Sequence, residues 1–338
     1  MTETDMAHEV IVIGAGIAGL VAANRAAQLG KRVVVLEKSE DERYLCNSRY
    51  TYGTLHINFT DVGADEDVLF GKIEACSEGF ARKDLARAIA KDGRRLMQWL
   101  KNEGIDLVDL GGYQTNVLAP PWRQGFGLTW RGYAGDVALQ RLEENLRQRQ
   151  GRILRGMRAR ALKFVSRRIE VETDAAAGAA RFSASSVVIA DGGFQASFDL
   201  IRTHICPAPE KLLARNGGSA TSDGLRMAQA VGAASAGLDM FYGHLHSRDA
   251  MSSTRLWPRP YVDERRRRSR GAPRKRLLRC SQRLALMPRR VSCDPYRRRS
   301  SHGIFQCRSA GGEPEWRMLD SSSAPSALRA ELETDFLR

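Results

Sequence analysis

The chain has 338 residues, of which 43% are hydrophobic, and a formal net charge of +14 at pH 7. This length provides for one large domain or two, and the sequence contains neither a run of about 18 apolar residues that could span a membrane nor an apolar signal-peptide core near its start. The six cysteines include no CxxC pair, which argues against a zinc or iron–sulfur site, so we expect a cytoplasmic protein without a metal centre.

The positive charge is concentrated near the end of the sequence. Residues 1–264 hold 34 Lys and Arg against 32 Asp and Glu, whereas residues 265–338 hold 19 against 7. A strong excess of positive charge often indicates binding to nucleic acid or to a membrane surface. Because the excess lies in the last segment, it says little about the function of the nearly neutral first part.

A glycine-rich turn follows the first predicted strand. The apolar run at residues 9–13 leads into Gly14, Gly16 and Gly19, which are spaced as GxGxxG and open an Ala-rich stretch. A second apolar run, at residues 31–36, ends at an acid, Glu37. An isolated GxGxxG is weak evidence and can arise by chance at the start of a helix. With both strands and the acid, the order predicts a βαβ unit that binds a dinucleotide.

Each residue of this pattern has a physical role in binding. Gly14 permits a tight turn, Gly16 lets a pyrophosphate approach the backbone, and Gly19 lets the helix pack closely on the strand. The first turn of the helix offers free N–H groups to the phosphates. Glu37 can accept hydrogen bonds from a ribose hydroxyl.

The segment at residues 84–103 has the apolar spacing of an amphipathic helix. Gly104 is a suitable residue to end it. The apolar residues expected on one face are Leu85, Ile89, Leu96 and Leu100.

The middle of the chain alternates between irregular stretches and short elements. Residues 105–134 are rich in Gly, Pro and aromatic residues, and then Asp136 is a candidate N-cap of a helix that runs to about Gln150. Short strands joined by a turn are expected at residues 153–171. A buried strand is expected at residues 185–190, and a short helix at residues 225–231.

The periodic pattern ends before the Arg run at residues 265–268. Residues 265–338 are rich in Arg, Ser and Pro and keep no helical or strand period, which is typical of a disordered basic tail. A second interpretation is a shifted reading frame, because alanine codons of GC-rich DNA become arginine codons in another frame. The composition leaves both interpretations open.

Four separated motifs occur within residues 8–262. They are the glycine-rich turn with Glu37 and Lys38, the segment Asn47-Ser48-Arg49 with Gly53, the segment Ala190-Asp191-Gly192-Gly193-Phe194, and the segment Thr221-Ser222-Asp223-Gly224. As a set they resemble the flavoprotein family of succinate dehydrogenases and fumarate reductases, in the soluble branch with tricarballylate dehydrogenase and the ketosteroid dehydrogenases. The resemblance implies an α/β fold with a Rossmann-like FAD-binding domain.

The resemblance also implies a division of the chain. We expect the N-terminal part of a discontinuous FAD-binding domain at residues 1–235 and the start of a capping, substrate-binding domain at residues 236–264. Residues 265–338 would form a basic tail of low order, after a truncation or frame shift near residue 264.

The cofactor implied by the resemblance is FAD. An NAD enzyme needs only the first motif, whereas a second Gly-Gly at a strand end suits the more extended FAD. No histidine lies within residues 47–53, so we expect FAD to be held without a covalent bond. Asp223 is either a cofactor contact or an aspartate that bonds its own turn. The expected cofactor contacts are Gly14, Gly16, Gly19, Glu37, Lys38, Asn47, Ser48, Gly53, Gly192, Gly193 and Asp223.

The chain departs from the family pattern at three places. It has Leu45-Cys46 where two glycines are usual, Tyr52 in place of a glycine, and Ser222 in place of another. Added bulk in a loop that approaches a phosphate or flavin weakens binding, so these changes affect the expected affinity for FAD.

The family transfers a hydride between the flavin and a carbon next to a carboxylate or carbonyl group of a small-molecule substrate. His244 matches the family's substrate-contacting histidine best, although a histidine hydrogen-bonded within a loop is an equal alternative. The family's proton-shuttling arginine lies in a later Gly-Arg-Arg-Phe-like strand, which is not found here. The catalytic residues and the electron acceptor therefore stay unassigned.

Three functional hypotheses follow. The first is an FAD-dependent oxidoreductase that acts on a CH–CH bond, impaired in this chain by the lost capping pattern. The second is a catalytically defective FAD-binding fragment. The third, from another class, is a nucleic-acid-binding protein that uses its basic tail; it lacks interleaved aromatic residues and a recognised binding fold.

Overall fold

In the computed structural model, the chain divides into two compact units, which we describe separately. The described residues are 8–51, 53–77, 80–119, 131–132, 134–176, 178–211, 217–239, 304–308 and 315–319. The first unit comprises residues 1–74, 81–197 and 214–236, and the second comprises residues 75–80, 198–213 and 237–338.

A four-stranded parallel sheet forms the centre of the first unit. Its order is β11 (Ser186–Ile189), β1 (Val10–Ile13), β2 (Val33–Leu36) and β7 (Arg152–Leu154). In the register, Ile11 lies opposite Val187 on one side and Val34 on the other. All four residues of β2 are buried, as expected for a strand covered on both faces.

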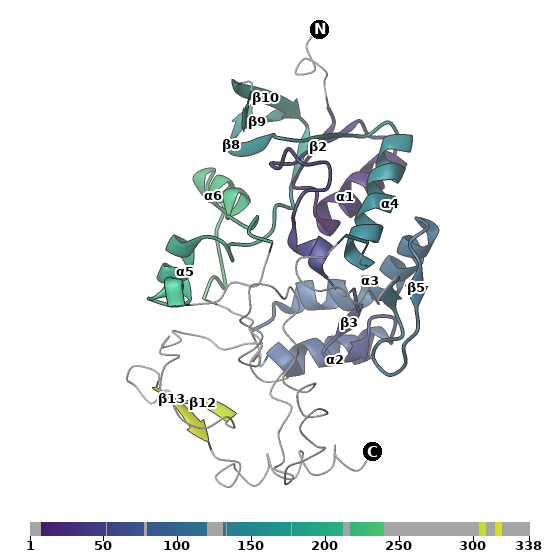
Figure 1. The fold of residues 1–338 in the computed structure, drawn as a ribbon, viewed down its shortest axis with the longest axis vertical. Helices are drawn as coiled ribbons and strands as arrows, with labels where there is room; N and C mark the ends of the chain where they lie inside the picture. Colours follow the sequence, from purple (N-terminus) through teal and green to yellow (C-terminus); the bar gives the residue numbers. More distant parts are fainter. Residues whose placement is uncertain are drawn as a thin grey trace. The chain divides into compact units, whose positions relative to one another are not determined.

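Helices cover one face of the parallel sheet. The helix α1 (Ile17–Gln28) returns along it and packs against α4 (Ala134–Gln148), as Figure 1 shows. Leu20, Leu139 and Leu142 are fully buried in the core between them. This is the βαβ unit that the sequence predicts.

An antiparallel sheet covers the other face. It has the order β10 (Gly178–Ala184), β9 (Arg168–Ala175) and β8 (Arg158–Val165) (Figure 1). Val171 and Phe182 point from it into a core shared with Ile11 and Val34 of the parallel sheet. The strands expected at residues 153–171 are therefore present, and the third strand extends the sheet beyond the expected range.

The helix expected at residues 84–103 is α3 (Lys83–Asn102), and it ends before Gly104, which has a φ of 72°. Its buried face differs from the predicted one, because Leu85 and Ile89 are 54% and 56% exposed. At Gly93, a Cβ would collide with the Val62 carbonyl, so small residues set the packed face through close approach. The buried residues are Ala86, Ala90, Gly93, Met97 and Leu100, while Leu96 is exposed like Leu85 and Ile89.

Asp136 is not the N-cap of α4, contrary to the sequence prediction. The helix begins at Ala134, so Asp136 lies in its first turn, fully buried. Its carboxylate accepts a hydrogen bond from the Gly132 amide and forms ion pairs with Arg43 and Arg49. Asp136 is therefore paired with two arginines of the segment that follows β2, one of them in a 3₁₀ helix, and the local sequence pattern does not indicate these partners.

The remaining elements are short. In the first unit these are the 3₁₀ helix η2 (Asn47–Tyr50), the hairpins β3 (His56–Ile57) with β4 (Thr60–Asp61) and β5 (Leu107–Val108) with β6 (Val117–Leu118), and the helix α6 (Asp223–Ala230). The helix α2 (Glu66–Ser77) precedes α3. The second unit holds α5 (Phe198–His204), the 3₁₀ helix η3 (Pro209–Lys211), and the antiparallel strands β12 (Ile304–Arg308) and β13 (Glu315–Leu319).

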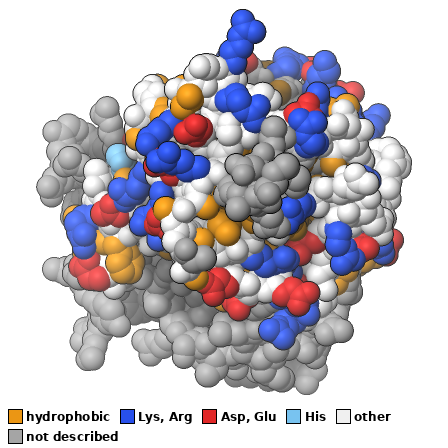
Figure 2. Space-filling view, turned by 90° about the horizontal axis from the view of Figure 1, so that it is seen from above, with side chains coloured by type: hydrophobic (Ala, Val, Ile, Leu, Met, Phe, Trp, Pro, Cys, Tyr) orange, Lys and Arg blue, Asp and Glu red, His pale blue; other side chains and the backbone are white. Residues whose placement is uncertain are grey.

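Three findings bear on the expected tail and on the class of protein. The strands β12 and β13 lie within residues 265–338, where no regular element was expected, and the rest of that segment lies outside the described residues. No helix in the described part of the chain has the length and hydropathy needed to cross a membrane. On the face in Figure 2, the described Lys and Arg side chains are interspersed with Asp and Glu.

Candidate dinucleotide-binding site

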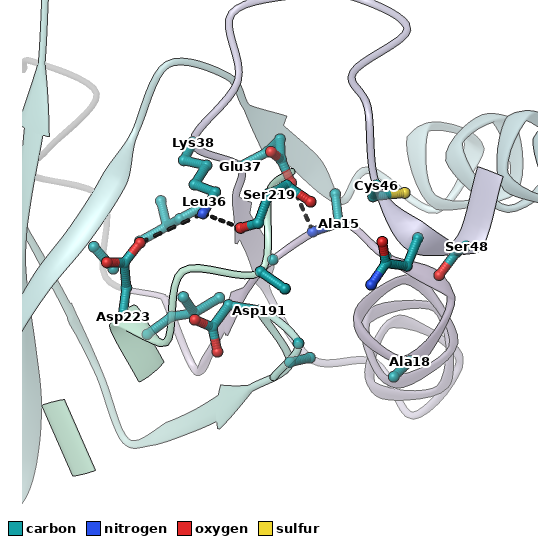
Figure 3. A pocket seen from close by; sticks show the side chains of 18 of the residues that line it. Ala15, Ala18, Leu36, Glu37, Lys38, Cys46, Ser48, Asp191, Ser219 and Asp223 are labelled. Atoms are coloured by element: carbon teal, nitrogen blue, oxygen red, sulfur yellow. Dashed lines mark hydrogen bonds and ion pairs between the residues drawn. The ribbon is translucent and has the colours of Figure 1, made fainter. Parts of the chain in front are cut away.

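A cavity lies where the carboxyl ends of β1, β2 and β11 meet, and Figure 3 shows it from close by. This edge of a parallel sheet is where α/β folds bind nucleotides, because the first helix turn also points there. Most of the expected cofactor contacts line the cavity. They are Gly14, Gly16, Glu37, Lys38, Asn47, Ser48, Gly192 and Asp223.

Close packing explains the first and third glycines of the turn. Gly14 has a φ of 95°, and a Cβ there would lie 2.7 Å from the Ala190 carbonyl oxygen of the neighbouring strand segment. A Cβ on Gly19 would overlap the Gly14 carbonyl oxygen. Gly19 does not line the cavity, so it acts by letting α1 approach β1, as predicted from its place in the motif.

Gly16 is the N-cap of α1 and borders the cavity. The nearest atom to a Cβ built on it would be Ser48 Oγ, at 3.4 Å, so the space beside this residue is otherwise open. Ser48 Oγ accepts a hydrogen bond from the Ile17 amide at 3.0 Å. The hydroxyl thus binds one of the first-turn N–H groups that a helix leaves without internal partners.

Glu37 is 6% exposed and holds the glycine-rich turn as well as the end of β2. Its Oε2 accepts the Ala15 N–H at 3.0 Å (Figure 3). Its Oε1 accepts the Ser39 N–H, also at 3.0 Å. A carboxylate oxygen has more than one acceptor site, so Glu37 can still bind a ribose hydroxyl.

Lys38 reaches across to a segment far along the chain. Its ammonium donates to the Ser219 carbonyl and lies 3.5 Å from Asp223 Oδ2 (Figure 3). It also donates to Thr221 Oγ1. The contacts of Lys38 are therefore to the protein. They hold residues 219–223 beside the end of β2, at the cavity wall.

Asp223 lies at the start of α6 and is the centre of a charged cluster. Arg158 of β8 donates to both its carboxylate oxygens, at 3.0 Å and 2.7 Å. Burial raises the pKa of Asp223, but hydrogen bonds from Arg158 and Thr221 and the charge of Lys38 more than offset this effect and lower it overall. The sequence did not point to Arg158, because nothing local in β8 indicates a partner on α6.

Asp191 is a further cavity residue, placed by the end of β11. Its Oδ2 accepts the Gly224 N–H at 2.7 Å, and a Cβ on Gly224 would overlap Oδ1. Burial is the main cause that raises the pKa of Asp191, and the nearby charge of Asp223 adds to it. The family motif contained Asp191, but the sequence gave it no individual role.

The other expected contacts differ in position. Asn47 Oδ1 accepts the Gly217 N–H at 2.7 Å, which joins η2 to the loop before α6. Gly53 has a φ of 82° and packs against Leu118, away from the residues that line the cavity. Gly193 also does not line it. His244 lies outside the described residues.

Arg49 of η2 is part of a buried charged cluster that the sequence analysis did not predict. Arg49 has no exposed surface and donates to the Tyr44 carbonyl at 2.7 Å and to Glu143 Oε1 at 3.0 Å, besides its ion pair with Asp136. Arg155 pairs with Glu143 at 2.8 Å. The signal available in the sequence was Arg49 itself, within the Asn-Ser-Arg motif.

The residues at this site fit a dinucleotide. The open side of Gly16 and the first turn of α1 suit a pyrophosphate, while the acid at the end of β2 suits a ribose. In the described part of the chain, no group of three or more His, Cys, Asp and Glu residues is arranged to hold a metal ion.

Two curated relatives match parts of the chain. Vinyl phenol reductase of Lactiplantibacillus plantarum is 26% identical over 261 residues, which cover 70% of this chain and 49% of the relative. L-aspartate oxidase of Mycobacterium bovis is 32% identical over 101 residues, which cover 30% of this chain and 19% of the relative. The chain thus spans about half the length of the first relative and less of the second.

Solved structures share the fold. The 3-ketosteroid-Δ4-(5α)-dehydrogenase of Rhodococcus jostii RHA1 superposes with a TM-score of 0.59 at 20% identity, covering 71% of this chain and 57% of that one. A flavocytochrome c3 fumarate reductase superposes with a TM-score of 0.58 at 21% identity, covering 69% and 42%.

A family model described as FAD binding domain matches residues 9–333. The matched range runs past residue 264, so the likeness to the family is not confined to the part before the basic segment. With the glycine-rich turn, the acid at the end of β2 and the shared fold, this match leads to one conclusion. The chain belongs to the FAD binding domain family.

Proposed function

We propose that this chain is the FAD-binding part of an oxidoreductase that acts on a CH–CH bond next to a carboxylate or carbonyl group of a small molecule, in the cytoplasm. The observation that carries the proposal is the cavity in which the first turn of α1 and Glu37 meet. When bound, FAD supplies hydride transfer at its flavin ring.

The names of similar proteins support the type of reaction. They include a vinyl phenol reductase, a dehydrogenase in complex with 4-androstene-3,17-dione, and a fumarate reductase. Vinyl phenol, androstenedione and fumarate each contain a carbon–carbon double bond, and in the last two it is conjugated with a carbonyl or carboxylate group. We extend this reaction class to the present chain.

The roles we assign to the described residues concern binding. Gly16 and the first-turn amides of α1 beyond Ile17, whose N–H Ser48 accepts, would hold the pyrophosphate, and Glu37 would hold the ribose. Asn47 and Ser48 would line the loop beside the cofactor. We keep His244 as the candidate substrate contact. We place the end of the FAD-binding part near residue 235, followed by the start of a substrate domain.

A second candidate is an FAD-binding chain with little or no turnover. It is favoured by the composition of residues 265–338, which are rich in Arg, Ser and Pro where a capping domain would continue. It is also favoured by the lack of the family's Gly-Arg-Arg-Phe-like segment in the sequence. Such a chain would bind FAD but hold a substrate poorly.

Purification followed by visible spectroscopy and FAD titration tests the proposal. We expect a flavin spectrum, or binding of added FAD, and release of the flavin into the supernatant on acid precipitation. Gly16→Val should abolish binding while the protein stays folded, whereas Gly71→Val, on the exposed side of α2, should bind normally. A folded protein that does not bind FAD would refute the proposal, and flavin in the acid pellet would refute the non-covalent attachment.

Stopped-flow assays separate the two candidates. Reduced, FAD-loaded protein is mixed with fumarate, with 4-androstene-3,17-dione or with a vinyl phenol, and flavin reoxidation is followed without oxygen. Reoxidation that depends on one of these compounds supports the oxidoreductase. FAD binding without any such reoxidation supports the defective chain.

A further inference from the structure

Tyr44 lies beneath the glycine-rich turn, and neither the sequence motifs nor the cavity lining includes it. Its side chain has no exposed surface. Its hydroxyl lies 2.6 Å from the Ala15 carbonyl oxygen and 2.9 Å from Glu143 Oε1. A buried hydroxyl so close to the backbone of a phosphate-binding turn calls for a functional explanation.

The hydroxyl has one proton and two acceptors within reach. Glu143 already pairs with Arg49 at 3.0 Å and with Arg155 at 2.8 Å. Among the described residues, the Ala15 carbonyl accepts a hydrogen bond only from Tyr44. Because a buried carbonyl oxygen without a hydrogen-bond donor is energetically costly, we assign the hydroxyl proton of Tyr44 to a hydrogen bond with the Ala15 carbonyl.

The surroundings keep Tyr44 in place as a donor. Arg49 lies over its ring, with Cζ 4.5 Å from the ring centroid, and Arg155 lies 5.8 Å away. Burial, followed by the negative charge of Glu143, raises the pKa of Tyr44, so the hydroxyl keeps its proton at neutral pH. The two arginines balance the carboxylate that faces the hydroxyl oxygen.

Both backbone groups of Ala15 are therefore held by side chains. Glu37 accepts its N–H at 3.0 Å, and Tyr44 donates to its carbonyl at 2.6 Å. The Ala15 carbonyl and the Gly16 N–H belong to one peptide group. In a trans peptide these two bonds point in opposite directions, so fixing the carbonyl toward Tyr44 directs the Gly16 N–H away from it.

We propose that Tyr44 is a positioning residue for pyrophosphate binding, which fixes the Ala15–Gly16 peptide so that the Gly16 N–H faces the cofactor phosphates. The inference rests on the proposed function, since it assumes that the cavity binds a dinucleotide. It assigns to Tyr44 an effect on phosphate recognition that does not extend to the adenosine part. This distinction makes the inference testable.

Tyr44→Phe removes only the hydroxyl and keeps the ring beside Arg49 and Arg155. FAD binding is measured by flavin fluorescence, and ADP and adenosine are measured by displacement of FAD. We expect the variant to bind FAD and ADP roughly tenfold more weakly, while its affinity for adenosine stays within about twofold of the wild type. The matched control is Tyr113→Phe, a tyrosine that packs against His56 and Phe59 and does not line the cavity.

The outcomes separate this inference from the proposed function. Equal losses for ADP and adenosine would show a general effect on the fold and overturn the role of Tyr44. Unchanged ADP affinity would overturn it as well. If the wild-type chain bound neither FAD nor ADP, the proposed function itself would fail, and with it the role of Tyr44.

Discussion

The two sheets of the first unit differ in how their side chains are used. The parallel strands β1 and β2 are almost completely buried: of their residues only Val10, the first of β1, is partly exposed. The antiparallel strands β8, β9 and β10 bury one face, which holds Val171 and Phe182, and expose the other, where Lys163 pairs with Glu172. The parallel sheet is covered on both faces, and the cavity lies at the end of the sheet where β1, β2 and β11 finish.

The ends of the parallel strands therefore provide most of the cavity residues, whereas the antiparallel sheet mainly supports them. The parallel sheet ends in the backbone groups and acid that would bind the cofactor. The antiparallel sheet contributes to the cavity chiefly through Arg158, which acts on Asp223, while the ion pairs on its outer face contact solvent. Substitutions should therefore have large effects near the parallel strand ends and small ones on the outer face.

The largest effect is expected at Gly19. In Gly19→Ala the new methyl group would overlap the Gly14 carbonyl, so α1 must move away from β1. We expect a loss of about 3 kcal/mol in the free energy of unfolding, together with loss of FAD binding. Denaturant unfolding followed by circular dichroism measures the first, and fluorescence titration measures the second.

The matched control for this change is Gly71→Ala on α2. A Cβ there meets no atom within 4 Å, so the substitution should leave FAD binding unchanged and stabilise the helix by about 0.5–1 kcal/mol. Equal stability of Gly19→Ala and the wild type would contradict the close packing of α1 on β1.

A smaller effect is expected at Glu37. Glu37→Ala removes the acceptor of the Ala15 and Ser39 amides as well as the ribose partner. We expect FAD binding to weaken by about 1–3 kcal/mol, measured by titration. Glu42→Ala, an exposed acid in the following loop, is the control and should bind FAD like the wild type. Unchanged affinity in Glu37→Ala would exclude it from ribose binding.

The Arg158–Asp223 pair should contribute less, and its effect should depend on pH. Because the folded-state pKa of Asp223 is lowered from 3.8, the pair stabilises the fold above that pH and loses this effect as pH falls through the folded value. We expect Arg158→Met to lose about 1 kcal/mol near neutral pH, discounted for solvent exposure, and less in acid.

Unfolding curves of the wild type and Arg158→Met at pH 7 and pH 3 measure this difference. Arg160→Met is the control, since it removes an exposed arginine of the same strand that pairs with Asp174. A difference between Arg158→Met and the wild type that grows in acid would reverse the expected sign and refute the lowered pKa of Asp223.

The smallest effect is expected on the outer face of the antiparallel sheet. Lys163 pairs with Glu172 at 2.7 Å, but both side chains are solvent-accessible and Arg181 lies close to the same carboxylate. Lys163→Met should therefore leave the unfolding midpoint and FAD affinity unchanged within error. A clear change in FAD affinity would mean that this face is coupled to the site.

The sequence analysis correctly predicted the features that depend on local patterns. The glycine-rich turn, the acid at Glu37 and the helix before Gly104 each follow from residues close together in the chain, and the structure has all three. The family model confirms the FAD-binding class. These features were predictable because their physical causes lie within a few residues.

Features that depend on distant partners were not predictable. The packed face of α3 is set by Gly93 against Val62, so the apolar stripe that includes Leu85 does not mark it. Asp136 forms an ion pair with Arg49 and does not cap α4. The position of Tyr44 under the glycine-rich turn depends on its contacts with Arg49 of η2 and Glu143 of α4, which no local sequence pattern indicates.

The Lys38 contacts have a consequence for protein synthesis. Lys38 binds Ser219 and Thr221, which lie 181 and 183 residues further along the chain. At about 5–20 residues per second, the ribosome adds these partners roughly 10–40 s after Lys38. For most of this interval the apolar strand β1 has no β11 beside it, so the nascent chain exposes a sheet edge that can pair with other chains. The cavity wall that includes Ser219, Ala220 and Asp223 is complete only after residue 223 has emerged.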